Sequence, residues 1–128
     1  MFIKIFDVDM REALESDSSK YQNFNDFFTR PLKPGSRPVG NSDIVSPADG
    51  IVSQFGFIES GSLVQAKGRF FLLSDLLGFG HKYSQENYEE GAFLTIYLSP
   101  SDYHRFHMPV SGTLLSTRYV PGVLYSVN

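Results

Sequence analysis

The chain has 128 residues, 41% of them hydrophobic and 15% aromatic, with a formal net charge of -3 at pH 7 and no cysteine. A chain of this length is expected to form one domain and to bury about two-thirds of its unfolded surface. Scattered Lys and Arg residues exclude the basic face of a nucleic-acid-binding protein, and the lack of cysteine excludes disulfide bonds, a thiolate nucleophile and Cys-ligated zinc.

The N-terminal segment Met1–Phe6 has four large apolar side chains around Lys4, namely Phe2, Ile3, Ile5 and Phe6. Two interpretations are open. The segment is either the end of an amphipathic helix that lies on a membrane surface, or an ordinary buried start of a helix or strand. The chain has no run of about 18 apolar residues, so we expect no transmembrane helix.

Two short helices are predicted within a helical N-terminal segment, residues 1–30. Asp9 is followed three positions later by Glu12, which is the spacing of a capping box, and Ala13–Glu15 are good helix formers. The segment Phe24–Phe28 has phenylalanine at positions i, i+3 and i+4, an apolar stripe that predicts a second helix with a face in the core.

A Pro- and Gly-rich connection over residues 31–47 separates this segment from a β-rich part, residues 48–128. The prolines exclude regular helix and favour an extended surface segment. The predicted strands are Ile44–Val45, Ile51–Ile58, Ser62–Ala66 and a mostly buried Ala92–Leu98, and a capped short helix is predicted at Ser74–Leu77, closed by Gly78.

The C-terminal residues Gly112–Leu115 and Tyr119–Val127 are also strand-like, and the sequence stops at Asn128 without a polar tail. A cut through a sheet leaves an exposed edge and uncovered apolar side chains, so we expect a fragment. The predicted fold class is α+β in one domain overall, mainly antiparallel β with a short helical N-terminal segment, and incomplete at the C-terminal edge.

Two of the three histidines, His104 and His107, lie three residues apart in a segment bracketed by prolines, which predicts a loop or a single helical turn. Three interpretations compete. The pair is a set of metal ligands completed by Asp49 or Asp102, a general acid and base, or part of the packed structure. The spacing alone is a weak zinc signal.

Asp49 lies in the segment Ser46–Gly50, where proline restricts the approach and glycine permits a sharp turn into the next strand. Such a turn holds a carboxylate at a sheet edge. The alternative is a plain turn in which Asp49 accepts hydrogen bonds from its own backbone.

A set of ordered blocks extends over nearly the whole chain. The blocks are Phe24–Phe28 with Arg30–Leu32, Pro47–Gly50, Gln65–Gly68, Tyr97–Pro100 with Asp102–Pro109, and Tyr119–Gly122 with Ser126–Asn128. Together they closely resemble the phosphatidylserine decarboxylase family. Any one block would be a weak signal, whereas their order along the chain is specific.

The resemblance implies a proenzyme that makes its own cofactor. In this family a serine of a Leu-Gly-Ser-Thr motif attacks the preceding peptide bond and becomes a pyruvoyl group at the N-terminus of the α chain. The pyruvoyl carbonyl forms a Schiff base with phosphatidylserine and accepts electrons as CO2 leaves, which gives phosphatidylethanolamine. By motif position, Asp49 and His107 act with the serine in self-cleavage, and His104 takes part in decarboxylation. We therefore expect Asp49 and His107 to meet in space.

The sequence departs from the family in lacking a Leu-Gly-Ser-Thr motif, so the residue that becomes the cofactor is absent from it. Leu115–Thr117 is not expected to be a processing site, because it lies within a predicted strand. The resemblance thus implies the early β-chain portion of a decarboxylase, inactive alone, with the missing C-terminal part or α chain and a membrane surface as partners. The expected location is peripheral, on the cytoplasmic side of the membrane.

Two alternatives stay open. The first is a non-catalytic lipid-surface or interaction domain on the same scaffold. The second is a metal-dependent enzyme that uses Asp49, His104 and His107, although the resemblance implies no metal ion.

Overall fold

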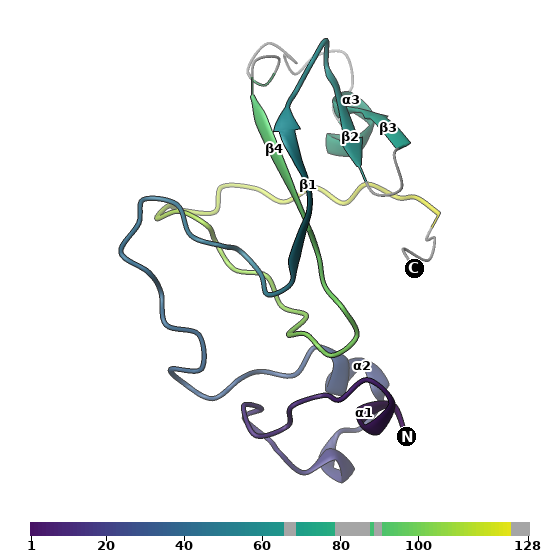
Figure 1. Ribbon diagram of the computed structural model, residues 1–128, viewed down its shortest axis with the longest axis vertical. Helices are drawn as coiled ribbons and strands as arrows, with labels where there is room; N and C mark the ends of the chain where they lie inside the picture. Colours follow the sequence, from purple (N-terminus) through teal and green to yellow (C-terminus); the bar gives the residue numbers. More distant parts are fainter. Residues whose placement is uncertain (66–68, 79–87, 89–90, 124–128) are drawn as a thin grey trace. The chain divides into compact units, whose positions relative to one another are not determined.

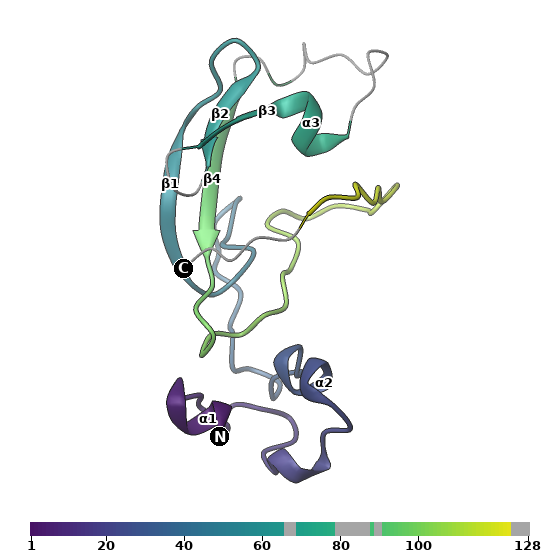
Figure 2. The same ribbon diagram turned by 90° about the vertical axis from the view of Figure 1, so that its right-hand side faces the viewer.

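Strands β1 (Ile51–Phe57) and β4 (Ala92–Tyr97) form a two-stranded sheet. The computed structural model describes residues 1–65, 69–78, 88 and 91–123. The two strands run in opposite directions, as Figures 1 and 2 show. Both are rich in β-branched and aromatic residues, which favour extended backbone. The Ser53 hydroxyl adds a cross-strand hydrogen bond, donated to the Thr95 carbonyl at 3.3 Å.

Strands β2 (Ser62–Gln65) and β3 (Arg69–Leu72) form an antiparallel pair in which Ser62 faces Leu72 and Gln65 faces Arg69. Helix α3 (Leu73–Leu77) follows β3 directly. Gly78 ends this helix in the left-handed conformation, with a φ of 63°. Its N–H is donated to the carbonyls of the last turn, as expected of a glycine C-cap.

Replacement of Gly78 by Ala is expected to destabilise the fold by more than about 1 kcal/mol, because a Cβ at positive φ is strained. A Cβ here would also lie 2.6 Å from Val120 Cγ2, so Val120 must move. Urea unfolding measures the loss. Gly112→Ala is the matched control, since a Cβ there meets nothing within 4 Å. Equal stability of the two variants would contradict the prediction.

Helices α1 (Phe2–Ile5) and α2 (Phe24–Phe28) carry an aromatic cluster, and η1 (Ser18–Lys20) is a 3₁₀ turn between them. The Phe2 ring lies 4.9 Å from the Phe24 ring and 5.9 Å from the Phe27 ring, centroid to centroid. Phe27 is buried, and Asn23 caps α2 by accepting a hydrogen bond from the Asp26 N–H at 3.0 Å. No helix among the described residues is long and apolar enough to cross a bilayer.

The chain divides into two compact units. Unit 1 consists of Met1–Ile51 with Tyr97–Thr113, and unit 2 consists of Val52–Ile96 with the residues from Leu114 onward. In unit 2, Ile58 and Leu73 are buried together, with Leu77 and Phe93 packed against them. The predicted division into segments 1–30, 31–47 and 48–128 of one domain stays a prediction.

The predicted α+β class with a mainly antiparallel β architecture is confirmed, and so are the helix at Phe24–Phe28 and the strands that became β1, β2 and β4. Residue 66, the predicted end of β2, lies outside the described residues. The predicted helix at Ser74–Leu77 is also confirmed, although α3 begins one residue earlier and has no side-chain cap.

The helix predicted to start at Asp9 is wrong. The Asp9 carboxylate accepts hydrogen bonds from the Arg11 backbone at 2.8 Å and from its guanidinium, which closes a local turn. The following backbone then pairs with a distant segment: Ala13 bridges Leu32, and the Leu14 N–H is donated to the Pro31 carbonyl at 2.9 Å.

Three further expectations are also wrong. Ile44–Val45 forms no strand; the Val45 N–H makes a single hydrogen bond to the Pro109 carbonyl instead. β4 is not mostly buried, because its side chains are half-buried or exposed. No strand is present at Gly112–Leu115 or over 119–123, where the side chains are exposed, and residues 124–127 lie outside the described part of the chain.

The N-terminal segment is not an ordinary buried start, because α1 has no fully buried residue. Phe2 is half-buried in the aromatic cluster, whereas Met1 is 99% and Ile5 is 59% exposed. A membrane-surface role for this segment stays a prediction.

Candidate functional site

A cavity of about 500 Å³ in unit 1 contains two of the three predicted site residues. Most of its lining is apolar, with a few polar side chains, which is typical of small-molecule sites. The lining consists of Arg37, Pro38, Val39, Gly40, Ser42, Ile44, Val45, Ser46, Pro47, Ala48, Asp49, Tyr103, His107 and Met108.

Two backbone hydrogen bonds hold the Asp49 turn beside the histidine loop. The His107 N–H is donated to the Pro47 carbonyl at 2.7 Å, and the Val45 N–H is donated to the Pro109 carbonyl at 2.9 Å. Gly50, at a φ of 125°, permits the turn into β1 that a side chain would disfavour. The fold therefore brings Asp49 and His107 to one cavity although they are far apart in sequence.

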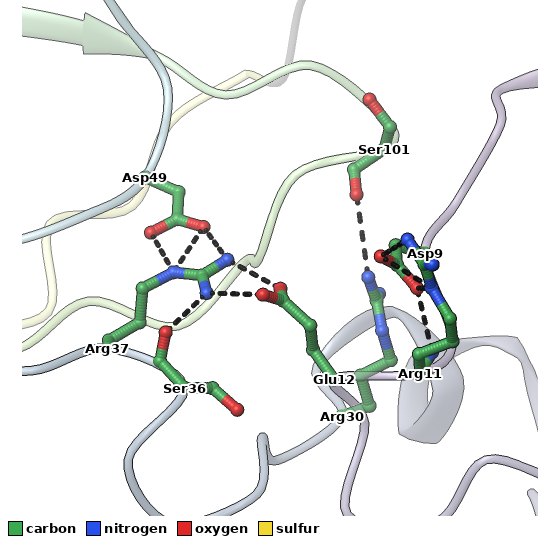
Figure 3. Close-up of polar contacts among 8 residues, drawn as sticks. All are labelled: Asp9, Arg11, Glu12, Arg30, Ser36, Arg37, Asp49 and Ser101. Atoms are coloured by element: carbon green, nitrogen blue, oxygen red, sulfur yellow. Dashed lines mark hydrogen bonds and ion pairs between the residues drawn. The ribbon is translucent and has the colours of Figure 1, made fainter.

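The Asp49 carboxylate is held by Arg37. Arg37 Nε donates to both carboxylate oxygens at 2.9 Å, and Arg37 Nη2 donates to Oδ2 at 2.6 Å (Figure 3). Planar guanidinium and carboxylate groups match in this arrangement, which makes it stronger than a single contact. The Asp49 side chain is only 23% exposed, so water screens the pair less than it screens an open surface pair.

Glu12 lies on the other side of the same guanidinium. Arg37 Nη1 and Nη2 donate to its two carboxylate oxygens at 3.1 and 2.9 Å. The hydrogen bonds to Asp49, and then those to Glu12, raise the pKa of the Arg37 guanidinium above its usual range. One cation thus links two carboxylates that come from different loops, and the trio has a net charge of about -1 at neutral pH.

The His107 ring contacts Tyr103. His107 Nε2 is 3.1 Å from the Tyr103 hydroxyl, and the two rings stack with centroids 5.6 Å apart. Tyr103 is buried, so it gives the imidazole a fixed neighbour. Asp49 and His107 line the same cavity, while their hydrogen bonds go to Arg37 and Tyr103, so a contact between the two stays a prediction.

His104 lies outside this cavity lining and packs against α2. Its ring stacks on Phe28 with centroids 3.9 Å apart, and its Nε2 is 2.9 Å from the Ser99 carbonyl oxygen. A carbonyl only accepts, so Nε2 carries a proton and Nδ1 is the nitrogen that remains to accept one. The Asp102 carboxylate accepts a hydrogen bond from the Ser99 N–H at 2.6 Å and so fixes that loop.

Arg30 is a buried cation close to this region, with only 2% of its surface exposed. Its Nη2 donates to the Ser101 carbonyl at 3.4 Å (Figure 3), whereas its Nε and Nη1 have no hydrogen-bond partner among the residues that the structure describes. Its guanidinium carbon lies 5.2 Å from the centre of the Phe27 ring. Burial lowers the pKa of this guanidinium, because a charge is poorly solvated there.

Replacement of Arg30 by Met is expected to leave stability unchanged or to raise it by about 1 kcal/mol, since it removes a poorly paired buried charge and keeps the volume. Arg30→Ala is expected to be less stable than Arg30→Met by about 2 kcal/mol, because it leaves a cavity. Urea unfolding of the two variants measures the difference. A loss above about 2 kcal/mol in Arg30→Met would contradict this account.

Among the residues that the structure describes, no group of three or more His, Asp or Glu side chains is arranged to hold a metal ion. Asp49, His104 and His107 therefore do not form the metal triad that one alternative requires. His104 is held on Phe28 and Ser99, away from the contacts of the other two.

Sequence reasoning missed Arg37 and Tyr103, which contact the two predicted cavity residues directly. Tyr103 lies within one of the blocks that carry the family resemblance. It precedes His107 by four residues, and this short separation could have indicated a contact between the two side chains. Arg37 had no local signal, because the two carboxylates that it binds come from distant parts of the chain.

Comparison with known proteins gives consistent matches. The phosphatidylserine decarboxylase family model matches residues 24–128. A phosphatidylserine decarboxylase proenzyme of Chromobacterium violaceum is 55% identical over 127 residues, which cover 99% of this chain and 45% of the relative. The proenzyme of Shewanella amazonensis is 53% identical over 129 residues, which cover 99% of this chain and 45% of that relative. The proenzyme of Legionella pneumophila (strain Corby) is 50% identical over 126 residues, which cover 98% of this chain and 44% of that relative. The chain thus spans a little less than half the length of these relatives.

Proposed function

This chain belongs to the phosphatidylserine decarboxylase family, and on that premise we propose that it is the early β-chain portion of a proenzyme that converts phosphatidylserine to phosphatidylethanolamine and CO2. The observation that carries the proposal is the identity of about half the residues, over nearly the whole chain, to curated proenzymes. Activity requires the rest of the protein, because the serine that the family converts to its cofactor is not among these residues.

The cavity suits the pyruvoyl group that this family uses. Such a group has two adjacent carbonyl oxygens, which accept hydrogen bonds, and the hydrogen-bonded pair of the Tyr103 hydroxyl and the His107 ring keeps one donor free in the lining. When bound, the group supplies the electron-withdrawing carbonyl that decarboxylation needs.

In self-cleavage, we assign the role of base to His107. A serine hydroxyl is a poor nucleophile until a neighbouring group takes its proton, and imidazole does this near neutral pH. Asp49 orients the imidazole and stabilises its protonated form. Both side chains line the same cavity, which supports the pairing.

In decarboxylation, we assign to His104 Nδ1 the transfer of a proton to the substrate carbon that has lost CO2. The Ser99 carbonyl keeps a proton on Nε2, and the stack on Phe28 fixes the ring plane. A ring held in this way presents one nitrogen in one direction, which a proton-transfer group requires. His104 and His107 therefore divide the work between two steps.

A lipid-surface function is the second candidate, because several large apolar side chains in and next to α1 and α2 are exposed. Met1 is 99% exposed, Ile5 59%, Phe24 55% and Phe6 40%. Aromatic and aliphatic side chains of this kind bind the boundary between headgroups and acyl chains. This surface also suits a decarboxylase whose substrate is a membrane lipid, so membrane contact is part of both candidates.

The test uses the complete protein that contains this sequence, mixed with vesicles of phosphatidylserine and phosphatidylcholine. We expect release of CO2 and formation of phosphatidylethanolamine, and neither product with phosphatidylcholine alone. Vesicle sedimentation without CO2 release would instead favour the lipid-surface domain. Absence of both would overturn both candidates.

A further inference from the structure

We propose that Arg37, held by Glu12, is a positioning residue that fixes the Asp49 carboxylate for its work beside His107. The inference rests on the proposed role of Asp49 in self-cleavage and adds two residues to it. Both lie outside the ordered blocks that relate this sequence to the family by motif.

The hydrogen bonds within the described part of the chain leave one acceptor position on Asp49. Arg37 Nε and Nη2 both donate to Oδ2, at 2.9 and 2.6 Å, whereas Oδ1 receives one bond, from Nε at 2.9 Å. Each carboxylate oxygen accepts about two hydrogen bonds, so Oδ1 keeps one site. Oδ1 is therefore the atom that accepts from the imidazole N–H when His107 is oriented.

Glu12 gives Arg37 a rigid support. The Glu12 carbonyl accepts a hydrogen bond from the Lys33 N–H at 2.8 Å, and Lys33 Nζ donates to the Arg11 carbonyl at 2.7 Å. Lys33 thus ties the two segments together through one backbone and one side-chain hydrogen bond. Arg37 itself also donates through Nη1 to the Ser36 carbonyl at 2.7 Å, which fixes the guanidinium plane.

Arg37 also shapes the space around His107. Arg37, Tyr103 and His107 line both the large cavity and a second one of about 210 Å³. Loss of the guanidinium would therefore release Asp49 and open the wall between the two cavities. If Arg37 served only to hold the loops together, its replacement would cause a small loss of stability and no specific loss of rate, because partly exposed ion pairs contribute about 0–1 kcal/mol. A positioning residue predicts a large loss of rate at similar stability.

The test measures self-cleavage of the complete proenzyme by the appearance of its two chains over time. Arg37→Gln is expected to slow cleavage about 100-fold, the usual effect of a misplacement of about 1 Å. Arg37→Lys keeps the charge without the planar fork, so it recovers only part of the rate. Glu12→Gln also slows cleavage, and adds nothing further when combined with Arg37→Gln, because it acts through Arg37.

Arg11→Gln is the matched control, since Arg11 binds Asp9 through a similar fork at the surface and is expected to cleave at the wild-type rate. Cleavage of Arg37→Gln at the Arg11→Gln rate, with Asp49→Asn uncleaved, would overturn the inference alone. Normal cleavage of Asp49→Asn would overturn the proposed role of Asp49 as well. Should Arg37→Gln not fold by circular dichroism, Glu12→Gln decides, and its cleavage at the wild-type rate would overturn the inference.

Discussion

Replacement of His107 by Asn in the complete proenzyme is expected to slow self-cleavage by at least about 100-fold, because the serine loses the base that takes its proton. His104→Asn is expected to cleave at close to the wild-type rate but to release CO2 at least about 100-fold more slowly, because His104 acts after the cofactor has formed. Gel electrophoresis of the two chains and a CO2 assay on phosphatidylserine vesicles measure the two steps separately.

This separation follows from the different surroundings of the two rings. His107 lines the Asp49 cavity, whereas His104 is held on Phe28 and Ser99. Thermal unfolding of both variants shows whether a lost step reflects a lost fold. The division of roles is wrong if His104→Asn blocks chain cleavage, or if His107→Asn is processed normally.

Replacement of Phe27 by Ala is expected to destabilise the protein by about 3–5 kcal/mol. Phe27 is 7% exposed, and its ring contacts those of Phe2, Tyr21 and Phe24 as well as the Arg30 guanidinium. Truncation therefore removes a large buried ring and leaves a cavity beside the Arg30 guanidinium. Urea unfolding measures the change.

Phe24→Ala is the control on the same helix, since the Phe24 side chain is 55% exposed. Its expected loss is about 1 kcal/mol, because only about half of its surface leaves water on folding. If both variants lose the same stability, the aromatic cluster is not centred on Phe27. If Phe24→Ala keeps stability but weakens vesicle binding, the membrane-surface role of this face gains support.

Local signals predicted the elements that local contacts stabilise. The helix at Phe24–Phe28 has its cap, Asn23, next to it, and α3 ends at a glycine in the left-handed conformation, so both could be read from neighbouring residues. The helix expected from Asp9 failed for the opposite reason. Its capping carboxylate bound Arg11, and its backbone paired with residues around Leu32, which local spacing does not reveal.

The candidate site was predictable only as a set of residue identities. Family resemblance pointed to Asp49, His104 and His107, and their roles stay predictions. The shared cavity of Asp49 and His107 depends on backbone pairing between the 45–47 and 107–109 segments, which are distant in sequence. The Arg37 contacts join two further segments, one with Arg37 and one with Glu12, to the Asp49 turn. No motif of fixed spacing could have shown them.

The most direct test of the central claim is an intact-mass measurement of the endogenous protein, captured with an antibody to residues 93–110 and treated with or without a carbonyl-reactive amine. A family decarboxylase predicts a polypeptide that contains these residues, together with a smaller companion chain that gains the mass of the amine adduct at its N-terminus. A protein without any amine-reactive companion would contradict the account, and the lipid-surface function would then become the leading candidate.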